Sequence, residues 1–62
     1  MEFRVRQIRQ EQGMTQAELA RRAGINRVTL CFIEKGGHET STKVLLALAK
    51  ALNVSIKDLF YD

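Results

Sequence analysis

The chain has 62 residues, 45% of them hydrophobic, and its ten Lys and Arg against seven Asp and Glu give a net charge of +3, values that fit one small folded domain rather than a disordered segment. With one Cys and one His, it lacks an internal disulfide, a metal-ligand cluster and the acid–base pair or activated nucleophile of an enzyme, so we expect no cofactor or small-molecule ligand. No apolar run approaches the roughly 20 residues that span a bilayer, and no secretory signal is present, so we expect a cytoplasmic protein without a membrane partner. The modest positive charge permits nucleic-acid binding without requiring it.

The first predicted element is an amphipathic helix over residues 2–12. Its apolar positions are Val5 and Ile8, with arginine and glutamine between them, and Gly13 follows as the helix end. Arg9 lies beside the apolar stripe, where a charged group needs either a partner or a path to water. Two interpretations are open for it: a partner that meets the guanidinium inside the protein, or an extended side chain that reaches the solvent.

A second helix is predicted over residues 16–23. Thr15 and Glu18 have the spacing of a capping box, in which each side chain binds a backbone N–H of the first helical turn. Gly24 closes the helix, because glycine adopts the left-handed conformation at little steric cost. Ala20 keeps the side chain small where a following helix has to cross this one.

A third helix, over residues 27–35, starts after the cap residue Asn26. The connection of about three residues between the two helices has the length that a helix-turn-helix requires, so residues 16–35 form its expected core. On the third helix, Leu30 and Ile33 are predicted to face inward. The opposite face would carry Arg27, Val28, Cys31, Phe32 and Lys35, at spacings of three and four residues.

The most apolar stretch of the chain predicts a fourth helix, which Ser41 or Thr40 caps at its start and Asn53 ends. Its apolar positions recur at helical spacing and mark it as the centre of the core: Val44, Leu45, Leu48, Ala49 and Leu52. Ser55 begins another capping box with the aspartate three residues later, so a short last helix is expected over residues 56–60. Five helices and no strand result.

Residues 16–35 resemble the helix-turn-helix of the phage-repressor and Cro type, the XRE-like or lambda-repressor-like family. Five residues stand on the family's characteristic positions: Gln16, Ala20, Gly24, Leu30 and Ile33. Similar segments at residues 8–9 and 48–55 extend the resemblance across nearly the whole chain. The resemblance implies an all-α, five-helix lambda-repressor-like DNA-binding domain, in which residues 1–62 form a single domain and the second and third helices are the helix-turn-helix.

The resemblance further implies a sequence-specific, double-stranded-DNA-binding transcriptional regulator, more often a repressor, with residues 27–35 as the recognition helix in the major groove. The family's base-reading positions fall on Arg27, Val28 and Phe32, with Cys31 beside them. Arg27 can donate two hydrogen bonds to guanine, while Val28 and Phe32 can contact thymine methyl groups. The family more often has a polar residue where Phe32 stands, so packing of Phe32 on the protein or in a dimer contact is an alternative.

Phosphate contacts are the second kind of DNA contact expected. Gln16 opens the second helix, where its side chain and the backbone N–H groups can both bind a phosphate oxygen. Arg9, Lys35 and Lys43 are the other phosphate-binding candidates. In the resembled family, the arginine that corresponds to Arg9 pairs with the glutamate that closes the recognition helix. A partly buried ion pair between Arg9 and Glu34 is therefore also expected.

A single recognition helix covers little DNA, so a homodimer on two half-sites about one helical turn apart is expected. Its surface is predicted at the end of the chain, where Ile56, Phe60 and Tyr61 are left as apolar groups. The alternative is that Ile56 and Phe60 fill the core of the monomer. The alternative function is a protein–protein interaction module on the same scaffold, in which the outward face of residues 27–35 binds another protein.

Overall fold

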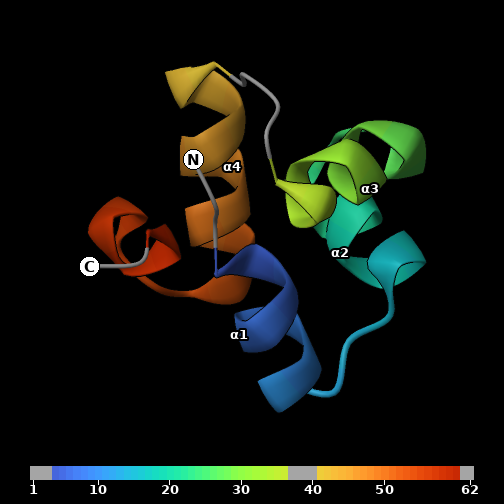
Figure 1. Cartoon of the computed structure of the whole chain (residues 1–62), viewed down its shortest axis with the longest axis horizontal. Helices are drawn as coiled ribbons and strands as arrows, with labels where there is room; N and C mark the ends of the chain where they lie inside the picture. Colours follow the sequence, from blue (N-terminus) through green and yellow to red (C-terminus); the bar gives the residue numbers. More distant parts are fainter. Residues whose placement is uncertain (1–3, 37–40, 61–62) are drawn as a thin grey trace.

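The computed structural model describes residues 4–36 and 41–60, which form four α-helices and one short 3-10 helix (Figure 1). The elements are α1 (Val5–Glu11), α2 (Gln16–Ala23), α3 (Arg27–Lys35), α4 (Thr42–Leu52) and η1 (Ile56–Leu59). The predicted all-α class is confirmed. The longest of these helices, α4, has 11 residues, and none in the described part of the chain is long and apolar enough to cross a membrane.

The first helix is shorter than predicted. It begins at Val5 instead of residue 2, and Arg4 is its N-cap residue without a capping side chain. The N–H of Arg4 donates to the carbonyl oxygen of Leu59 at 2.6 Å, so the chain just before α1 pairs with η1. Gly13 follows α1 with a φ of 73°, the left-handed conformation in which a glycine commonly ends a helix.

The last element, η1, is a 3-10 helix where the sequence predicted a short helix over residues 56–60. Its N–H groups donate to carbonyl oxygens three residues back rather than four, Asp58 to Ser55 at 3.0 Å and Phe60 to Lys57 at 3.3 Å. A four-residue segment offers almost no room for the α-helical bonding pattern, and the tighter 3-10 turn is common in such short pieces. The described residues therefore form four α-helices and one 3-10 helix where the sequence predicted five helices.

The ends of α2, α3 and α4 are set mostly by the residues that the sequence indicates. Asn26 caps α3 and Ser41 caps α4, each through a side-chain oxygen that accepts a backbone N–H of the first turn. Gly24 and Asn53 end α2 and α4 in the left-handed conformation, with φ of 72° and 59°. The alternative cap of α4, Thr40, lies outside the described residues.

The start of α2 contains only half of the predicted capping box. Thr15 Oγ1 accepts the N–H of Glu18 at 3.1 Å. The carboxylate of Glu18 instead pairs with Arg22, one turn later on the same helix, at 2.7 Å. A side chain four residues away faces the carboxylate on the helix surface, so the charged partner replaces the predicted bond to the N–H of Thr15.

The hydrophobic core gathers around α4, which Figure 1 shows between η1 and the pair α2 and α3. α2 packs against α3 and α4, and α1 packs against the same two helices. Side chains with no exposed surface come from every element: Val5, Leu19, Leu30, Leu48, Leu52 and Leu59. The central position predicted for the fourth helix is therefore confirmed.

Asp58 links the stability of η1 to pH. Its Oδ2 accepts the N–H of Ser55 at 3.1 Å and the hydroxyl of Ser55 at 2.8 Å, in the predicted capping box. The hydroxyl bond, then the backbone bond, and further the charges of Lys57 and Arg4, hold the pKa of Asp58 below its usual value. A depressed pKa means that the unfolded chain binds the proton first as the pH falls.

This contribution to stability is therefore complete above about pH 4, the range where a free Asp titrates, and is lost as the pH falls through the folded pKa. We expect the urea midpoint of the native chain to exceed that of an Asp58→Asn variant at neutral pH, by a difference that shrinks on acidification. Parallel urea titrations of the two chains at several pH values measure it, because the chains differ only at residue 58. A difference that stays constant with pH would contradict the prediction.

Candidate nucleic-acid interface

The turn between α2 and α3 comprises residues 24–26. The N–H of Ile25 donates to the carbonyl oxygen of Ala20 at 3.0 Å and closes the end of α2. A Cβ added at Gly24 would meet no atom within 4 Å, so its positive φ, and not a lack of space, is what favours glycine there. The predicted helix-turn-helix core over residues 16–35 is therefore present, with Ala20 only 3% exposed.

α3 has a buried side and an exposed side. Leu30 and Ile33 are 0% and 2% exposed and fix the helix to the core, as predicted. On the other side, Val28 is 55% exposed and Phe32 is 46% exposed. We call this side the outer face of α3; its members are the exposed Arg27, Val28, Phe32 and Lys35 and the half-buried Cys31.

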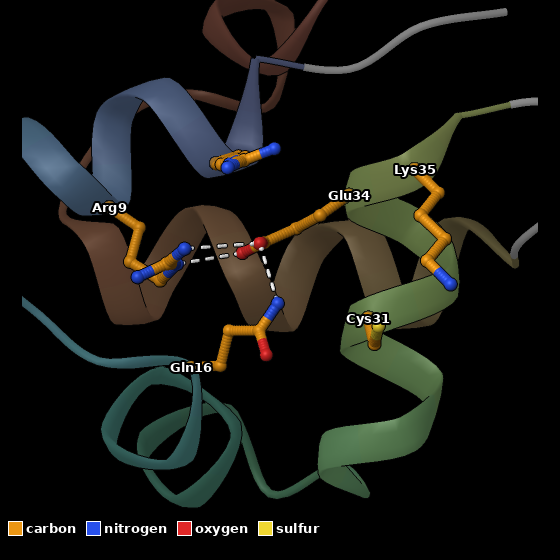
Figure 2. Close-up of a pocket in the computed structure, with 6 residues that line it drawn as sticks. Arg9, Gln16, Cys31, Glu34 and Lys35 are labelled. Atoms are coloured by element: carbon orange, nitrogen blue, oxygen red, sulfur yellow. Dashed lines mark hydrogen bonds and ion pairs between the residues drawn. The ribbon is translucent and has the colours of Figure 1, made fainter.

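Arg9 and Glu34 form the expected ion pair, which joins α1 to α3 (Figure 2). Arg9 Nε donates to Glu34 Oε2 at 2.8 Å and Nη2 donates to Oε1 at 3.2 Å, the two-pronged geometry of a strong arginine–carboxylate contact. Nη1 donates to the carbonyl oxygen of Met14 at 2.7 Å. The side chains of the pair are 10% and 3% exposed, so the interpretation in which Arg9 extends to the solvent is wrong.

The phosphate contact expected of Arg9 stays a prediction. Each of its three guanidinium nitrogens already donates to an acceptor within the protein, and the residue is only 8% exposed. A guanidinium carries five N–H groups, so these three hydrogen bonds do not use all of its donors. Arg9 therefore joins α1 to α3 through Glu34 and still has donors for a phosphate.

Gln16 belongs to the same network, through a contact that the sequence analysis missed. Its Nε2 donates to Glu34 Oε1 at 3.0 Å, as Figure 2 shows. The sequence contains one indication of such a contact. A carboxylate can accept about four hydrogen bonds, and Arg9 donates only two to Glu34, so a further donor is to be expected. Nothing in the local sequence identifies which residue supplies it. The bond holds the amide of Gln16, the first residue of α2, against α3.

An open hollow of about 330 Å³ lies beside this network, between α1, α2 and α3 (Figure 2). Its lining residues are Arg6, Arg9, Gln16, Cys31, Glu34 and Lys35. Because Arg9 offsets the charge of Glu34, the exposed Arg6 and Lys35 leave the hollow positive. Lys43, the remaining phosphate candidate, is exposed on α4 and is not part of this lining.

The residues predicted for the dimer surface are less exposed than expected. Ile56 and Phe60 are partly buried and pack against the hydrophobic core. Each side chain both packs against the core and keeps part of its surface exposed, so the dimer contact through Ile56 and Phe60 stays a prediction. Tyr61 lies outside the described residues.

Asn26 sets the start of α3, and its removal is expected to weaken the fold. Asn26 Oδ1 accepts the N–H of Val28 at 2.7 Å. We predict that Asn26→Ala lowers the free energy of unfolding by about 1 kcal/mol, the usual cost of losing an N-cap side chain, whereas Asn26→Ser retains most of it. Urea denaturation of the three chains measures this, and equal midpoints for all of them would contradict it.

Comparison with known sequences places this arrangement in a family. Residues 5–59 match the sequence profile of the helix-turn-helix family. Over 60 residues, the chain is 42% identical to an uncharacterized HTH-type transcriptional regulator of Archaeoglobus fulgidus, which covers 97% of this chain and 86% of that protein. It is 31% identical over 61 residues to the uncharacterized HTH-type transcriptional regulator YgzD of Bacillus subtilis, covering 98% and 92% of the two chains.

Solved structures of known proteins are similar to this fold over most of its length. The restriction-modification controller protein C.AhdI of Aeromonas hydrophila superposes with a TM-score of 0.88 at 33% identity, over 92% of this chain and 86% of that chain. SinR, the master regulator for biofilm formation of Bacillus subtilis, solved in complex with DNA, superposes with a TM-score of 0.82 at 33% identity, over 87% of each chain. The chain belongs to the helix-turn-helix family.

Proposed function

We propose that this chain is a sequence-specific, double-stranded-DNA-binding transcriptional regulator of the cytoplasm, with α3 as the recognition helix in the major groove. One observation carries the proposal: Leu30 and Ile33 anchor one side of α3 in the core, while the outer face of α3 is largely exposed. The names of the relatives and the SinR–DNA complex support it. Repression is the sign of regulation that the resemblance to phage repressors implies.

The charges of α3 fit a polyanionic partner. Arg27 and Lys35 are exposed at its two ends. The one acidic residue of the helix, Glu34, has a side chain that is 3% exposed and bonded to Arg9. The outer face of α3 therefore has cationic groups at both ends and no exposed carboxylate between them. This is the charge arrangement expected of a surface that binds a phosphate-rich ligand such as DNA.

The proposed contacts divide into two kinds. The proposed base contacts are Arg27, Val28, Cys31 and Phe32. The proposed phosphate contacts are Gln16, Arg9, Lys35 and Lys43. The guanidinium of Arg27, in the first turn of α3, can donate to guanine O6 and N7. The amide of Gln16 is already held by Glu34, so little side-chain freedom is lost when it meets a phosphate. Phosphate contacts of this kind fix the register on the duplex and leave sequence choice to the base contacts.

A homodimer on two half-sites is part of the proposal. α3 has nine residues, and one such helix buries too little DNA surface for useful affinity alone. Two copies related by two-fold symmetry would place their recognition helices about one helical turn of DNA apart. The proposed contact is the end of the chain near η1, through the exposed remainders of Ile56 and Phe60 and through Tyr61.

The test is selection of bound duplexes from a random DNA pool, followed by affinity measurements on the selected duplex at several salt concentrations. A motif with two related half-sites supports a dimeric sequence-specific regulator. The logarithm of the binding constant should fall with the logarithm of the salt concentration, with a slope of about −0.9 for each phosphate that the protein neutralises.

A second candidate function is a protein–protein interaction module on the same fold. The observation that favours it is the exposure of Val28 and Phe32, at 55% and 46%, on one helix face. If no motif is recovered and binding to duplexes is weak and equal for all sequences, this second function is favoured.

Arg27 gives the sharpest single-residue test of base reading. We expect Arg27→Ala to cost about 1–3 kcal/mol of binding free energy on the selected duplex and to relax the preference at one position of each half-site. Lys43→Ala is the matched control, because losing a phosphate contact weakens all sequences alike and reduces the salt slope by about one. An Arg27→Ala loss that is uniform across sequences would remove Arg27 from the base contacts.

A further inference from the structure

We propose that α3 selects DNA through the C5-methyl groups of pyrimidines, so that the protein accepts 5-methylcytosine where it accepts thymine. This inference rests on the proposed function and identifies the chemical group that the site recognises. The observation is the place of the exposed large hydrophobic residues. Val28 and Phe32 of the outer face of α3 are 55% and 46% exposed, and the other large hydrophobic residue of comparable exposure in the described chain, Leu46 at 53%, is on α4.

The chemistry of the major groove narrows what such side chains can read. Base edges there carry hydrogen-bond donors and acceptors, and one apolar group, the C5-methyl of thymine. Val28 and Phe32 have no side-chain donor or acceptor, so they gain by burying a methyl group and lose by covering a polar base atom. The apolar part of the outer face of α3 therefore favours positions where a pyrimidine carries a methyl group.

The same absence of polar atoms limits what these two residues distinguish. Thymine presents an acceptor at O4 and cytosine presents a donor at N4, and an apolar side chain hydrogen-bonds to neither. 5-Methylcytosine places its methyl group at the same ring carbon as thymine. A contact that reads the methyl group alone thus treats thymine and 5-methylcytosine alike, and rejects uracil and unmodified cytosine alike.

The spacing of the two side chains predicts a pattern in each half-site. Four residues advance an α-helix by about 6 Å, and successive nucleotides of one strand are about 3.4 Å apart along the duplex. Val28 and Phe32 therefore reach methyl groups about two nucleotide steps apart when α3 follows the groove. Arg27 precedes Val28 directly and can bind a neighbouring guanine. Each half-site is expected to combine a guanine with two C5-methylated pyrimidines.

The experiment uses the duplex selected from the random pool. Each thymine is replaced singly by deoxyuridine, which removes the methyl group and nothing else. We expect about a fourfold loss of affinity at two positions of each half-site, the factor that corresponds to burying one methyl group. At those positions, a 5-methylcytosine–guanine pair should bind about fourfold more tightly than a cytosine–guanine pair.

Protein variants connect the effect to the two side chains. Val28→Ala and Phe32→Ala should each abolish the methyl effect at one position and keep it at the other. Leu46→Ala is the matched control, because it removes a similarly exposed side chain from α4 and should keep both effects. All three positions are on the surface, and circular dichroism verifies that the variants fold.

The inference is overturned, with the proposed function intact, by a selected duplex in which no thymine-to-uracil change alters affinity by more than about twofold. Methyl effects that persist in both Val28→Ala and Phe32→Ala have the same consequence. Recovery of no sequence-selective duplex would overturn the proposed function and this inference together. Equal binding of cytosine and 5-methylcytosine at the positions sensitive to uracil would also contradict the inference, and would leave the proposed function intact.

Discussion

Replacing Glu34 by alanine should lower the free energy of unfolding by about 3–5 kcal/mol, a large part of the stability of so small a domain. The change strands the guanidinium of Arg9, which is 8% exposed and donates two of its hydrogen bonds to Glu34. It also removes the acceptor of the Gln16 amide. Urea denaturation followed by circular dichroism measures the loss, and calorimetry provides an independent value.

The chain contains its own control for this prediction. Glu18 and Arg22 form an ion pair of similar length, 2.7 Å, with side chains that are 32% and 52% exposed. Because water solvates an exposed pair, Glu18→Ala should cost no more than about 1 kcal/mol. A loss in Glu34→Ala as small as that in Glu18→Ala would show that the buried pair contributes nothing special to the fold.

A double replacement separates the attraction within the pair from the cost of stranding one charge. Arg9→Met combined with Glu34→Leu leaves no buried charge, and such apolar substitutions for a buried pair are often neutral or stabilising. We therefore expect the double variant to be more stable than Glu34→Ala alone. A double variant as unstable as the single one would mean that the directional hydrogen bonds, and not charge burial, determine the cost.

Leu30→Ala should lower the free energy of unfolding by about 2–5 kcal/mol, the range for removing a large buried aliphatic side chain. Leu30 has no exposed surface and anchors α3 to the core. The recognition helix should therefore lose its fixed position as well as its stability. Thermal and urea denaturation measure the first effect, and DNA affinity at a temperature where the variant remains folded measures the second.

Val28→Ala is the matched control for Leu30→Ala, because both residues lie on α3 and Val28 is 55% exposed. It should change the free energy of unfolding by no more than about 0.5 kcal/mol, as surface substitutions usually do. Its effect should appear in DNA binding instead. Equal destabilisation by the two variants would contradict the assignment of a buried side and an outer face to α3.

The local structure of the helix-turn-helix could be predicted from neighbouring residues alone. Asn26 caps α3 through a hydrogen bond to a residue of the first helical turn. Gly24 ends α2 because its own backbone adopts the left-handed conformation. The two faces of α3 follow in the same way from residue spacing along one helix. In each of these cases, the residues that produce the structure lie within a few positions of it in the sequence.

The hydrogen bonds between distant residues depend on how the helices pack. Gln16 meets Glu34 across 18 positions, and Arg9 meets it across 25. No local pattern shows which donors reach one carboxylate, so the hydrogen bond between Gln16 and Glu34 was not predicted. Packing likewise decided that Phe60 rests against the core. Burial and hydrogen-bond competition between distant segments are properties of the folded chain, because only folding brings those segments within reach of each other.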